Sequence, residues 1–287
     1  MKEDSYIVVN DVKITHPDKL LFPEARVTKG MMAVYYAMIA KYMLPHIKNR
    51  PLSLKQYPEG ITKTGFFHKH AAGFYPESIP VFKIAMHKEH GKIDMVGAAT
   101  AQDLVYMAGQ NAIEFHIPTA TVKHISKPDQ IILDYDPSDN DFEKVRALAF
   151  ITRDILTDHK MQSFVKTTGN RGVHVHIPIQ ANRDYDEVKP IAKELATAIT
   201  QQAPDLATTE LRKNKRGNKV FIDYLRNDYG MTAVAPYSLR ANKAAGVATP
   251  ISWDELKKKS LQPDSFTIHN IEKRVKNFKD PWSKYPI

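Results

Sequence analysis

The sequence of 287 residues predicts an α/β (α+β) fold whose second half contains a β-α-β-β-α-β unit. Apolar residues at strand spacing predict four strands, over 131–136, 163–167, 173–179 and 219–225. Apolar residues at helical spacing predict two helices, near 145–156 and 188–199. In this split βαβ topology the first strand lies centrally, between the third and the fourth. Polar residues on three segments that are distant in sequence are therefore expected side by side.

The first half of the chain predicts a β-rich lobe with one long helix. Apolar residues recur at helical spacing from Met31 to Met43, with Thr28 as the expected cap and Pro45 as the expected end. Another helix is expected near 101–110, and short strands over 52–57, 66–68, 79–84, 93–96 and 112–117. No internal repeat or low-complexity linker divides the chain. We therefore expect one domain over 1–287, with an N-terminal lobe over about 1–125 and a core lobe over about 126–287.

The composition is that of a globular protein with a basic surface. Lys and Arg number 41 against 32 Asp and Glu, which gives a formal net charge of +9 and a pI of about 9.4. Such a surface attracts phosphate backbones or anionic membranes without selecting either. The absence of cysteine excludes disulfides, thiolate metal ligands and a cysteine nucleophile. Because no signal stretch or membrane span is visible, we expect an intracellular protein that does not interact with membranes.

Three aspartates form the first candidate site. Asp134 and Asp136 are two residues apart on a predicted strand and therefore project from the same face, while Asp223 lies on the neighbouring predicted strand. Adjacent carboxylates among apolar residues repel each other and lose hydration, so a cation or a proton must compensate. Oxygen ligands suit Mg²⁺ or Mn²⁺, and two such ions can support phosphoryl transfer. Alternatively, the Asp-Tyr-Asp-Pro segment only ends a strand and caps the following helix.

A glycine-flanked turn forms the second candidate site. Gly169 and Gly172 bracket a turn whose backbone N–H groups can bind an anion, and Thr168 and Arg171 add further donors. His174 follows on the next predicted strand, where it shares one face with His176. The turn and His174 would cradle a nucleotide triphosphate. An ordinary hairpin with a solvated histidine face, or a zinc site that uses both histidines, remains an alternative.

A basic segment precedes the last strand of the predicted unit. Five cations fall within eight residues between Arg212 and Lys219. This segment is either a solvated loop or a loop that binds the phosphates of a nucleotide or of DNA. Because the segment leads directly into the strand of Asp223, we favour phosphate binding.

These motifs together resemble the archaeo-eukaryotic primase superfamily. Within it, they are most similar to the polymerase of prokaryotic non-homologous end joining, the ligase D polymerase-domain family, here in its standalone form. The resemblance covers nearly the whole chain and rests on the order and spacing of motifs over 15–23, 65–69, 114–118, 133–137, 166–176, 219–224 and 235–240. It implies a primase-polymerase fold with a ferredoxin/RRM-like β-α-β-β-α-β catalytic core and a β-rich N-terminal lobe.

The resemblance also implies roles for single residues. Asp134, Asp136 and Asp223 would be catalytic and would bind two Mn²⁺ or Mg²⁺ ions, with Asp223 placed to receive the proton of the primer 3′-hydroxyl. The incoming nucleotide would be bound by Lys55, His116, Thr168, Gly169, Arg171, Gly172, His174, Lys219 and Arg240. The 5′-phosphate of the downstream DNA strand would be bound by His16, Lys19 and Lys29, and template bases would stack on Phe66 and Phe67.

Without the resemblance these last residues have simpler interpretations. Lys19 and Lys29 would be solvated surface residues, and Phe66 and Phe67 would be core residues. Because the two rings point to opposite faces of a strand, one can pack while the other stacks on a base. The chain departs from the family pattern at three positions. Thr168 stands where Ser is usual and Arg171 where Lys is usual, and both keep a donor. Arg226 stands where several relatives carry a neutral polar residue, which would change contacts with the nucleotide.

The implied function is DNA-templated nucleotidyl transfer that fills gaps and extends 3′ ends in double-strand break repair, with a preference for ribonucleotides. The implied partners are DNA with gaps or 3′ overhangs and a 5′-phosphate, NTP or dNTP, a separate DNA ligase and a Ku-type end-binding protein. The implied location is the cytoplasm of a prokaryotic cell, in association with the nucleoid. A replicative-type primase that makes short primers is the alternative. A metal-dependent nuclease and a non-catalytic DNA-end-binding module remain as rivals, since either can carry carboxylates on a basic protein.

Overall fold

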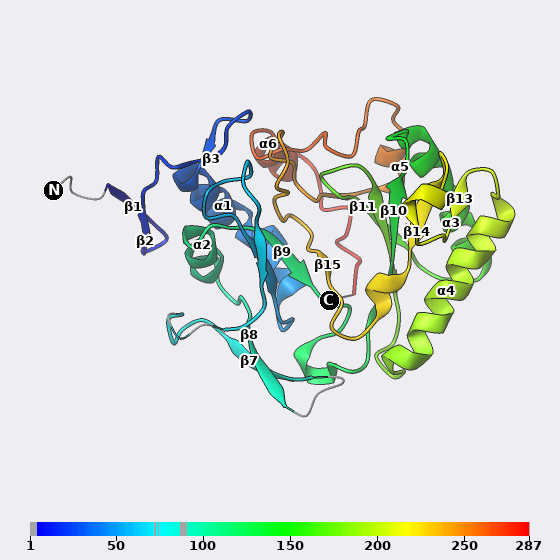
Figure 1. Cartoon of the computed structure of the whole chain (residues 1–287), viewed down its shortest axis with the longest axis horizontal. Coiled ribbons are helices and arrows are strands. Elements are labelled where there is room, and N and C mark those ends of the chain that lie inside the picture. The colour runs from blue at the N-terminus through cyan, green and yellow to red at the C-terminus, as the bar shows by residue number, and fades with distance from the viewer. Residues whose placement is uncertain (1–4, 72, 74, 87–90, 287) are drawn as a thin grey trace.

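The computed structural model describes residues 5–71, 73, 75–86 and 91–286. Two groups of elements lie side by side (Figure 1). One group holds α1, α2 and β9, and the other holds β10, β14 and the long helices α3 and α4. No helix among the described residues is long and apolar enough to cross a membrane.

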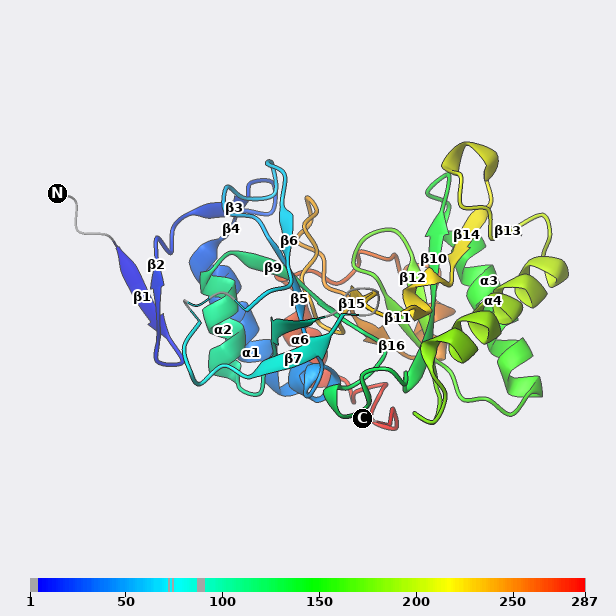
Figure 2. The same ribbon diagram turned by 60° about the horizontal axis from the view of Figure 1, so that its bottom comes forward.

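A six-stranded sheet forms the second group and confirms the predicted β-α-β-β-α-β unit. Its strand order is β13, β14, β10, β12, β11, β16. The bounds are β10 Gln130–Pro137, α3 Phe142–Asp158, β11 Phe164–Thr167, β12 Val173–Pro178, α4 Tyr185–Gln202, β13 Ala207–Thr208, β14 Val220–Asp223 and β16 Pro250–Ile251. As predicted, β10 lies between β12 and β14. Both helices cover the same face of this sheet (Figure 2), so the other face is left for the polar residues.

Alternation along the strands explains this division. Leu133 and Tyr135 of β10 and Val173 and Val175 of β12 are fully buried in one apolar cluster with α3 and α4. The intervening residues face the other way. The predicted last strand, 219–225, ends two residues earlier than expected, at Asp223, because the chain turns into a single 3₁₀ turn, η3, over Leu225–Asn227. The edge strands β13 and β16 are too short to give a sequence pattern.

The first group is built on a four-stranded sheet of order β15, β9, β5, β6. The bounds are β5 Ser53–Gln56, β6 Phe66–His68, β9 Ala112–Ile117 and β15 Ala233–Val234, with α1 over Lys29–Ile47 and α2 over Ala101–Gly109. Three hairpins complete it: β1 Tyr6–Val9 with β2 Val12–Thr15, β3 Leu20–Phe22 with β4 Val27–Thr28, and β7 Val81–Ala85 with β8 Lys92–Val96.

The long helix α1 corrects two predictions. Thr28 caps it as expected, since its hydroxyl accepts from the Met31 N–H, but the helix continues past Pro45 to Ile47. Proline removes one backbone donor, and so close to the end of a helix this costs only one bond. The predicted apolar stripe from Met31 to Met43 includes Met31 and Val34, but these side chains are 41% and 53% exposed, because the buried face of the helix is rotated toward residues such as Met32.

The chain returns to the first group after completing the second. Ala235, Tyr237 and Val247, together with α6 (Ile271–Asn277), belong to the apolar cluster of α1 and β9. The short helix α5 (Trp253–Leu256) and η1 (Val122–His124) lie outside the two sheets. The single domain over 1–287 with lobes divided near 125 stays a prediction, and residues 1–4 and 287 lie outside the described residues. Each group has its own large apolar cluster, which leaves room for a polar surface between the two groups.

Candidate active site

A row of polar residues crosses the helix-free face of the six-stranded sheet. Asp134 on β10 pairs with His174 on β12 at one side and with Asp223 on β14 at the other. Lys166 on β11 pairs with His174 and extends the row to four strands. Directly paired residues project from the same face, so the strand register itself assembles this site.

Each oxygen of Asp134 and Asp223 lies near a protein nitrogen. Asp134 Oδ1 lies 3.4 Å from His174 Nε2, and Asp223 Oδ1 accepts a 2.8 Å hydrogen bond from the Leu225 N–H. The remaining oxygens face one guanidinium, with Arg226 Nε 3.4 Å from Asp223 Oδ2 and 3.9 Å from Asp134 Oδ2. Arg226 therefore bridges carboxylates on two strands.

The pKa values of the three aspartates are raised. Burial is the largest cause in each case, because it penalises the charged form. The charge of Asp134 further raises the pKa of Asp136 and of Asp223, while Arg226 opposes the shift in all three. The site is thus a concentration of negative charge that its own cations only partly compensate.

The chemistry of this donor set fits a hard divalent cation, since it consists of carboxylate oxygens that need positive charge. Among the described residues, however, no three His, Asp or Glu side chains are gathered closely enough to hold a metal ion. Arg226 lies between Asp134 and Asp223, and Asp136 is 46% exposed and faces Arg171 Nη2 at 3.7 Å. The assignment of the three aspartates as metal ligands stays a prediction.

The glycine-flanked turn is packed tightly against its surroundings. Gly169 has φ +69°, and an added Cβ would lie 2.6 Å from the Val247 backbone; at Gly172 it would lie 1.8 Å from the Tyr135 carbonyl oxygen. The Thr168 hydroxyl accepts from the backbone N–H groups of Asn170 and Gly172, at 3.3 and 3.2 Å. Only glycine fits at these two positions, so the turn is held rigidly at the end of β11.

Arg171 and Lys219 lie at the border of the site. Arg171 Nη1 donates to the Asn140 side chain at 3.3 Å. Lys219 directly precedes β14, and its carbonyl oxygen accepts a 3.3 Å hydrogen bond from Ser138, which follows β10. Lys219 therefore lies at the edge of the sheet where β10 ends and β14 begins, the two strands that carry the aspartates.

The histidines are buried, so the solvated-face alternative is wrong. His174 and His176 are 3% and 2% exposed, and burial is the main cause that lowers the pKa of both. The Nδ1 atom of His176 lies 2.8 Å from the Gln130 side-chain oxygen, and its ring packs edge-on against Trp282. Its ring faces the protein interior, and the zinc alternative finds no support among the described residues.

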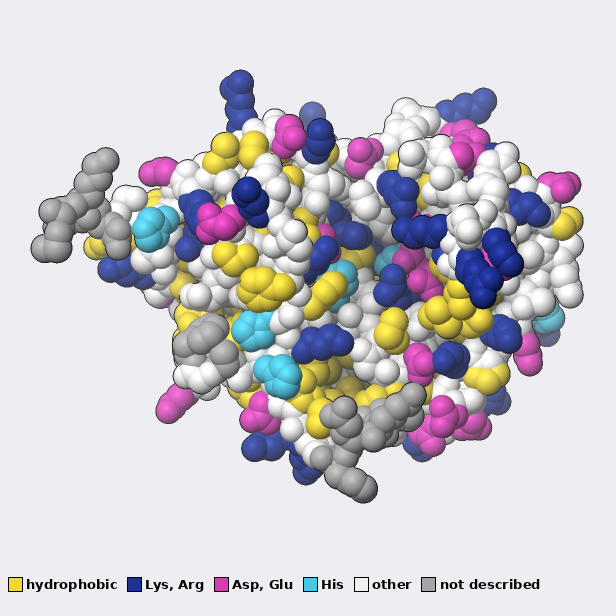
Figure 3. Space-filling view, in the orientation of Figure 1, with side chains coloured by type: hydrophobic (Ala, Val, Ile, Leu, Met, Phe, Trp, Pro, Cys, Tyr) yellow, Lys and Arg dark blue, Asp and Glu magenta, His cyan; other side chains and the backbone are white. Residues whose placement is uncertain are grey.

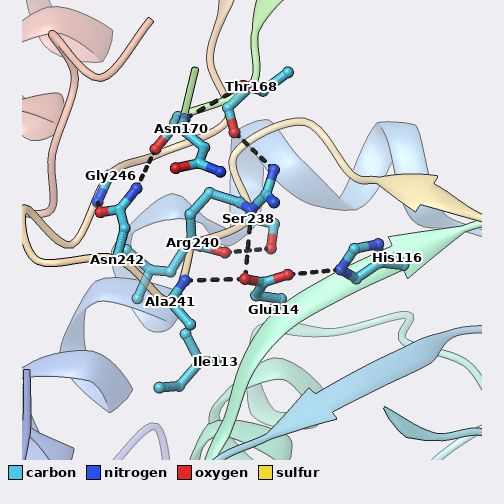
Figure 4. A network of polar contacts seen from close by, with 12 residues as sticks. Ile113, Glu114, His116, Thr168, Asn170, Ser238, Arg240, Ala241, Asn242 and Gly246 are labelled. Carbon is cyan, nitrogen blue, oxygen red and sulfur yellow. Dashed lines mark hydrogen bonds and ion pairs between the residues drawn. The ribbon is translucent and has the colours of Figure 1, made fainter. Parts of the chain in front are cut away.

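The opposite wall comes from the four-stranded sheet, where Glu114 of β9 occupies the centre of a polar network (Figure 4). Its carboxylate lies 2.8 Å from His116 Nε2 and 3.4 Å from Arg240 Nε, and accepts from the Ala241 N–H at 3.0 Å. Burial alone would raise the pKa of Glu114, but the hydrogen bond from His116 and the charge of Arg240 lower it to about 2. Arg240 also donates to the Thr168 carbonyl at 3.0 Å, which ties the two walls together.

A cavity of about 590 Å³ opens between the walls. Of the predicted site residues, it is lined by Lys55, Phe67, His116, Asp134, His174 and Arg240. The rest of the lining is Ser53, Lys69, Glu114, Arg226 and the segment 230–234. Figure 3 shows Lys, Arg and His side chains around a hollow at the centre of this face. The hollow has the size of a small-molecule site, and its charged lining consists of Lys55, Lys69, Arg226 and Arg240 against Glu114 and Asp134.

Phe66 and Phe67 are not core residues, since each is 52% exposed on the edge strand β6. The Phe67 ring lies 5.3 Å from the His116 ring, and Lys55 Nζ lies 5.6 Å from its centroid. Phe67 therefore borders the cavity. That one ring packs while the other stacks on a base stays a prediction.

The three candidates for 5′-phosphate binding gather at the β3–β4 hairpin. His16 has φ +52° in the turn before β3, and its carbonyl oxygen accepts from the Lys19 N–H. The Lys29 N–H donates to the Lys19 carbonyl at 2.9 Å. Burial, and then the charge of Lys19, lower the pKa of Lys29, which is 6% exposed. Lys29 is thus not a solvated surface residue, whereas Lys19 is 36% exposed and pairs with Glu59 at 3.3 Å.

The comparisons with known proteins agree with this geometry. A family model described as the primase-polymerase domain of LigD matches residues 28–282. The chain belongs to this family. The expected family and fold class are therefore confirmed, and membership makes the chain a nucleotidyltransferase of the polymerase class. A solved structure, the polymerase domain from Mycobacterium tuberculosis ligase D in complex with DNA, is 27% identical with a TM-score of 0.87 and covers 98% of both chains.

Curated relatives include the bifunctional non-homologous end joining protein LigD of Bacillus subtilis, 31% identical over 94% of this chain. The multifunctional LigD of Pseudomonas aeruginosa is 30% identical over 96% of it. The chain spans 44% and 33% of the length of these two relatives. The resemblance to LigD therefore concerns the polymerase part of longer proteins.

Sequence reasoning missed three residues of the site. Lys166 is fully buried, and no partner for its Nζ is found within the described part of the chain. Glu114 precedes His116 by two residues on one strand, so alternation could have placed both on one face. Arg226 was noted only as a departure, although its spacing of three residues from Asp223 fits an ion pair in a tight turn.

Proposed function

We propose that the chain performs DNA-templated nucleotidyl transfer, fills gaps and extends 3′ ends during non-homologous end joining, and prefers ribonucleotides. The observation that carries this proposal is the alignment of Asp134, Asp223 and His174 across three strands beside a cavity whose lining includes Lys55, Arg226 and Arg240. The names of the LigD relatives support the end-joining role.

The nucleotide would enter the cavity with its triphosphate toward the glycine turn. Arg240 and Lys55 supply charge from the first wall, while Thr168, Arg171, His174 and Lys219 approach from the second. His116, held by Glu114, completes the first wall. The backbone of Gly169 and Gly172 fixes the turn, so these donors are positioned before the nucleotide arrives.

The carboxylates would hold Mn²⁺ or Mg²⁺, two ions in all, which supply charge that stabilises both the attacking and the leaving oxygen. Asp134 and Asp136 come from one strand and Asp223 from the next. Asp223 would also receive the proton of the primer 3′-hydroxyl.

DNA would be bound by two further groups of residues. His16, Lys19 and Lys29 would bind the 5′-phosphate of the downstream strand, and Phe66 and Phe67 would stack on template bases. The DNA complex of the Mycobacterium tuberculosis domain supports a DNA substrate. Sealing would need a DNA ligase and a Ku-type end-binding protein as partners, in the prokaryotic nucleoid.

The test is primer extension on a short-gapped duplex with a 5′-phosphate, with Mn²⁺ or Mg²⁺ and with ribo- or deoxynucleotides. We expect metal-dependent extension that is faster with ribonucleotides and is lost in Asp134→Ala. Equal rates would refute the sugar preference. Absence of extension with degradation of the DNA would replace the proposal with a nuclease, and synthesis from two free nucleotides on single strands would favour a replicative-type primase.

A further inference from the structure

The guanidinium of Arg226 occupies the position where a cation is most needed. It lies 3.4 Å from Asp223 Oδ2 and 3.9 Å from Asp134 Oδ2, while the other oxygen of each carboxylate faces His174 or the Leu225 N–H. All four oxygens thus have a protein nitrogen nearby. A metal ion that binds both carboxylates must take over the two oxygens that face Arg226.

The backbone under Arg226 is fixed, so only its side chain can give way. The neighbouring Asn227 is fully buried, and its side chain accepts from the Ile132 N–H at 2.8 Å and donates to the Ile132 carbonyl at 2.7 Å. It also donates to the Tyr224 carbonyl at 2.8 Å. These bonds pin the η3 turn to β10, two residues from Asp134, and hold the base of Arg226 beside the site.

The Arg226 side chain can also point into the cavity. It is 36% exposed and lines the cavity together with Lys55, His116 and Arg240. A long, partly exposed side chain on a fixed turn can leave the carboxylates for the cavity without any movement of the sheet. In the cavity the guanidinium would face the phosphates of a bound nucleotide, for which its planar set of donors is well suited.

We propose that Arg226 is an internal counter-ion that neutralises Asp134 and Asp223 in the metal-free protein and must be displaced when a divalent cation binds. This inference rests on the proposed metal site and adds a positioning residue to it. The positive charge of Arg226 and that of the metal compete for the same oxygens. The affinity of the site for a divalent cation is therefore lower than it would be without Arg226.

The test is the affinity of the full chain for Mn²⁺ without nucleotide or DNA, measured by the electron paramagnetic resonance signal of free Mn²⁺. We expect Arg226→Gln to bind Mn²⁺ at least about tenfold more tightly than the wild type, because removal of a nearby positive charge favours the cation. Arg226→Lys, which keeps the charge, should stay within about threefold. Arg153→Gln controls for the loss of one positive charge elsewhere, and should match the wild type.

A second readout uses the wild-type protein. Titration with Mg²⁺ should shift the Arg226 Nε–H signal in the ¹H–¹⁵N spectrum, which is assigned by its absence in Arg226→Lys. Equal Mn²⁺ affinity of Arg226→Gln and the wild type, or an unshifted signal at saturating Mg²⁺, would overturn the inference. The failure of the proposed metal site would look different: Asp134→Asn would then bind Mn²⁺ as tightly as the wild type.

Discussion

The two groups of predicted ligands, at the carboxylate row and at the β3–β4 hairpin, differ in how the chain builds them. Asp134, Asp223 and His174 belong to regular strands, and the sheet register places them side by side. Lys19 and Lys29 meet through a turn and a helix start that hydrogen-bond to each other. The first arrangement is rigid and lies between two walls, whereas the second stands on a local hairpin. We infer that chemistry and DNA anchoring reside in separable parts of the molecule.

The largest expected effect is the loss of primer extension, without loss of DNA binding, when a carboxylate of the row is removed. Asp223→Ala should lower primer extension by on the order of 10³-fold, because it removes a carboxylate that contacts the reacting oxygens. The affinity for gapped DNA with a 5′-phosphate should stay within about twofold, as read by fluorescence anisotropy. Wild-type-like extension would exclude Asp223 from the chemistry.

The second prediction concerns Glu114, in the cavity wall opposite the carboxylate row. Glu114→Gln should lower the free energy of unfolding by about 3 kcal/mol near neutral pH, since it leaves His116 and Arg240 without their carboxylate. The folded pKa of Glu114 is lowered from 4.5 to about 2. Its contribution is therefore complete above 4.5 and is lost as the pH falls toward 2.

Urea unfolding of wild type and Glu114→Gln at pH 7 and pH 4 checks whether the stability contributed by Glu114 falls with the pH. The difference between the two proteins should be smaller at pH 4, where the unfolded carboxyl is already largely protonated. Lys144→Gln, which removes an exposed pair with Asp139, serves as the control and should change stability by less than about 1 kcal/mol. A difference for Glu114→Gln that grows toward acid pH would contradict the assignment of Glu114 as an ionised partner.

The third prediction removes one charge from the anchoring group. Lys29→Met should reduce the preference for a 5′-phosphate by about tenfold in affinity, since a buried lysine beside Lys19 is suited to a doubly charged phosphate. Extension at saturating DNA should remain. The comparison uses identical gapped duplexes with and without the phosphate, and an unchanged ratio of affinities would remove Lys29 from the pocket.

The smallest effect is expected at Phe67. Phe67→Leu keeps an apolar side chain against His116 but removes a flat ring, so template affinity should fall by about fivefold. Phe66→Leu provides a matched change on the same strand with the same exposure. A binding titration with a gapped duplex that carries a fluorescent template base distinguishes the two, and no change in either variant would exclude stacking at this edge.

The sequence predicted the regular part of the site better than the irregular part. Strand alternation and the split βαβ topology placed Asp134, Asp223 and His174 on one face, because both rules depend only on period and strand order. Burial of the two histidines was not foreseen, since that of His176 depends on the distant Trp282, whose ring packs against it. The exposure of Met31 and Val34 was missed because helical spacing does not tell which side of a wide apolar surface is covered.

Contacts between distant turns were the hardest to foresee. The bridge from Arg226 to two carboxylates depends on the η3 turn and its Asn227 bonds to Ile132, which leave no periodic pattern. The link from Arg240 to Thr168 joins segments 72 positions apart. The resemblance to a known family pointed to Thr168 and Arg240 as nucleotide-binding residues, but only the structure shows how they hold each other.

The separation of chemistry from DNA anchoring is tested most directly by comparing one variant of each part on the same substrate. Extension and 5′-phosphate-dependent affinity are measured for Asp223→Ala and for Lys29→Met on the same gapped duplex. We predict that Asp223→Ala loses extension and keeps the phosphate preference, while Lys29→Met loses the preference and keeps extension at saturating DNA. If either variant loses both properties while remaining folded, the two parts are not separable and the central claim is wrong.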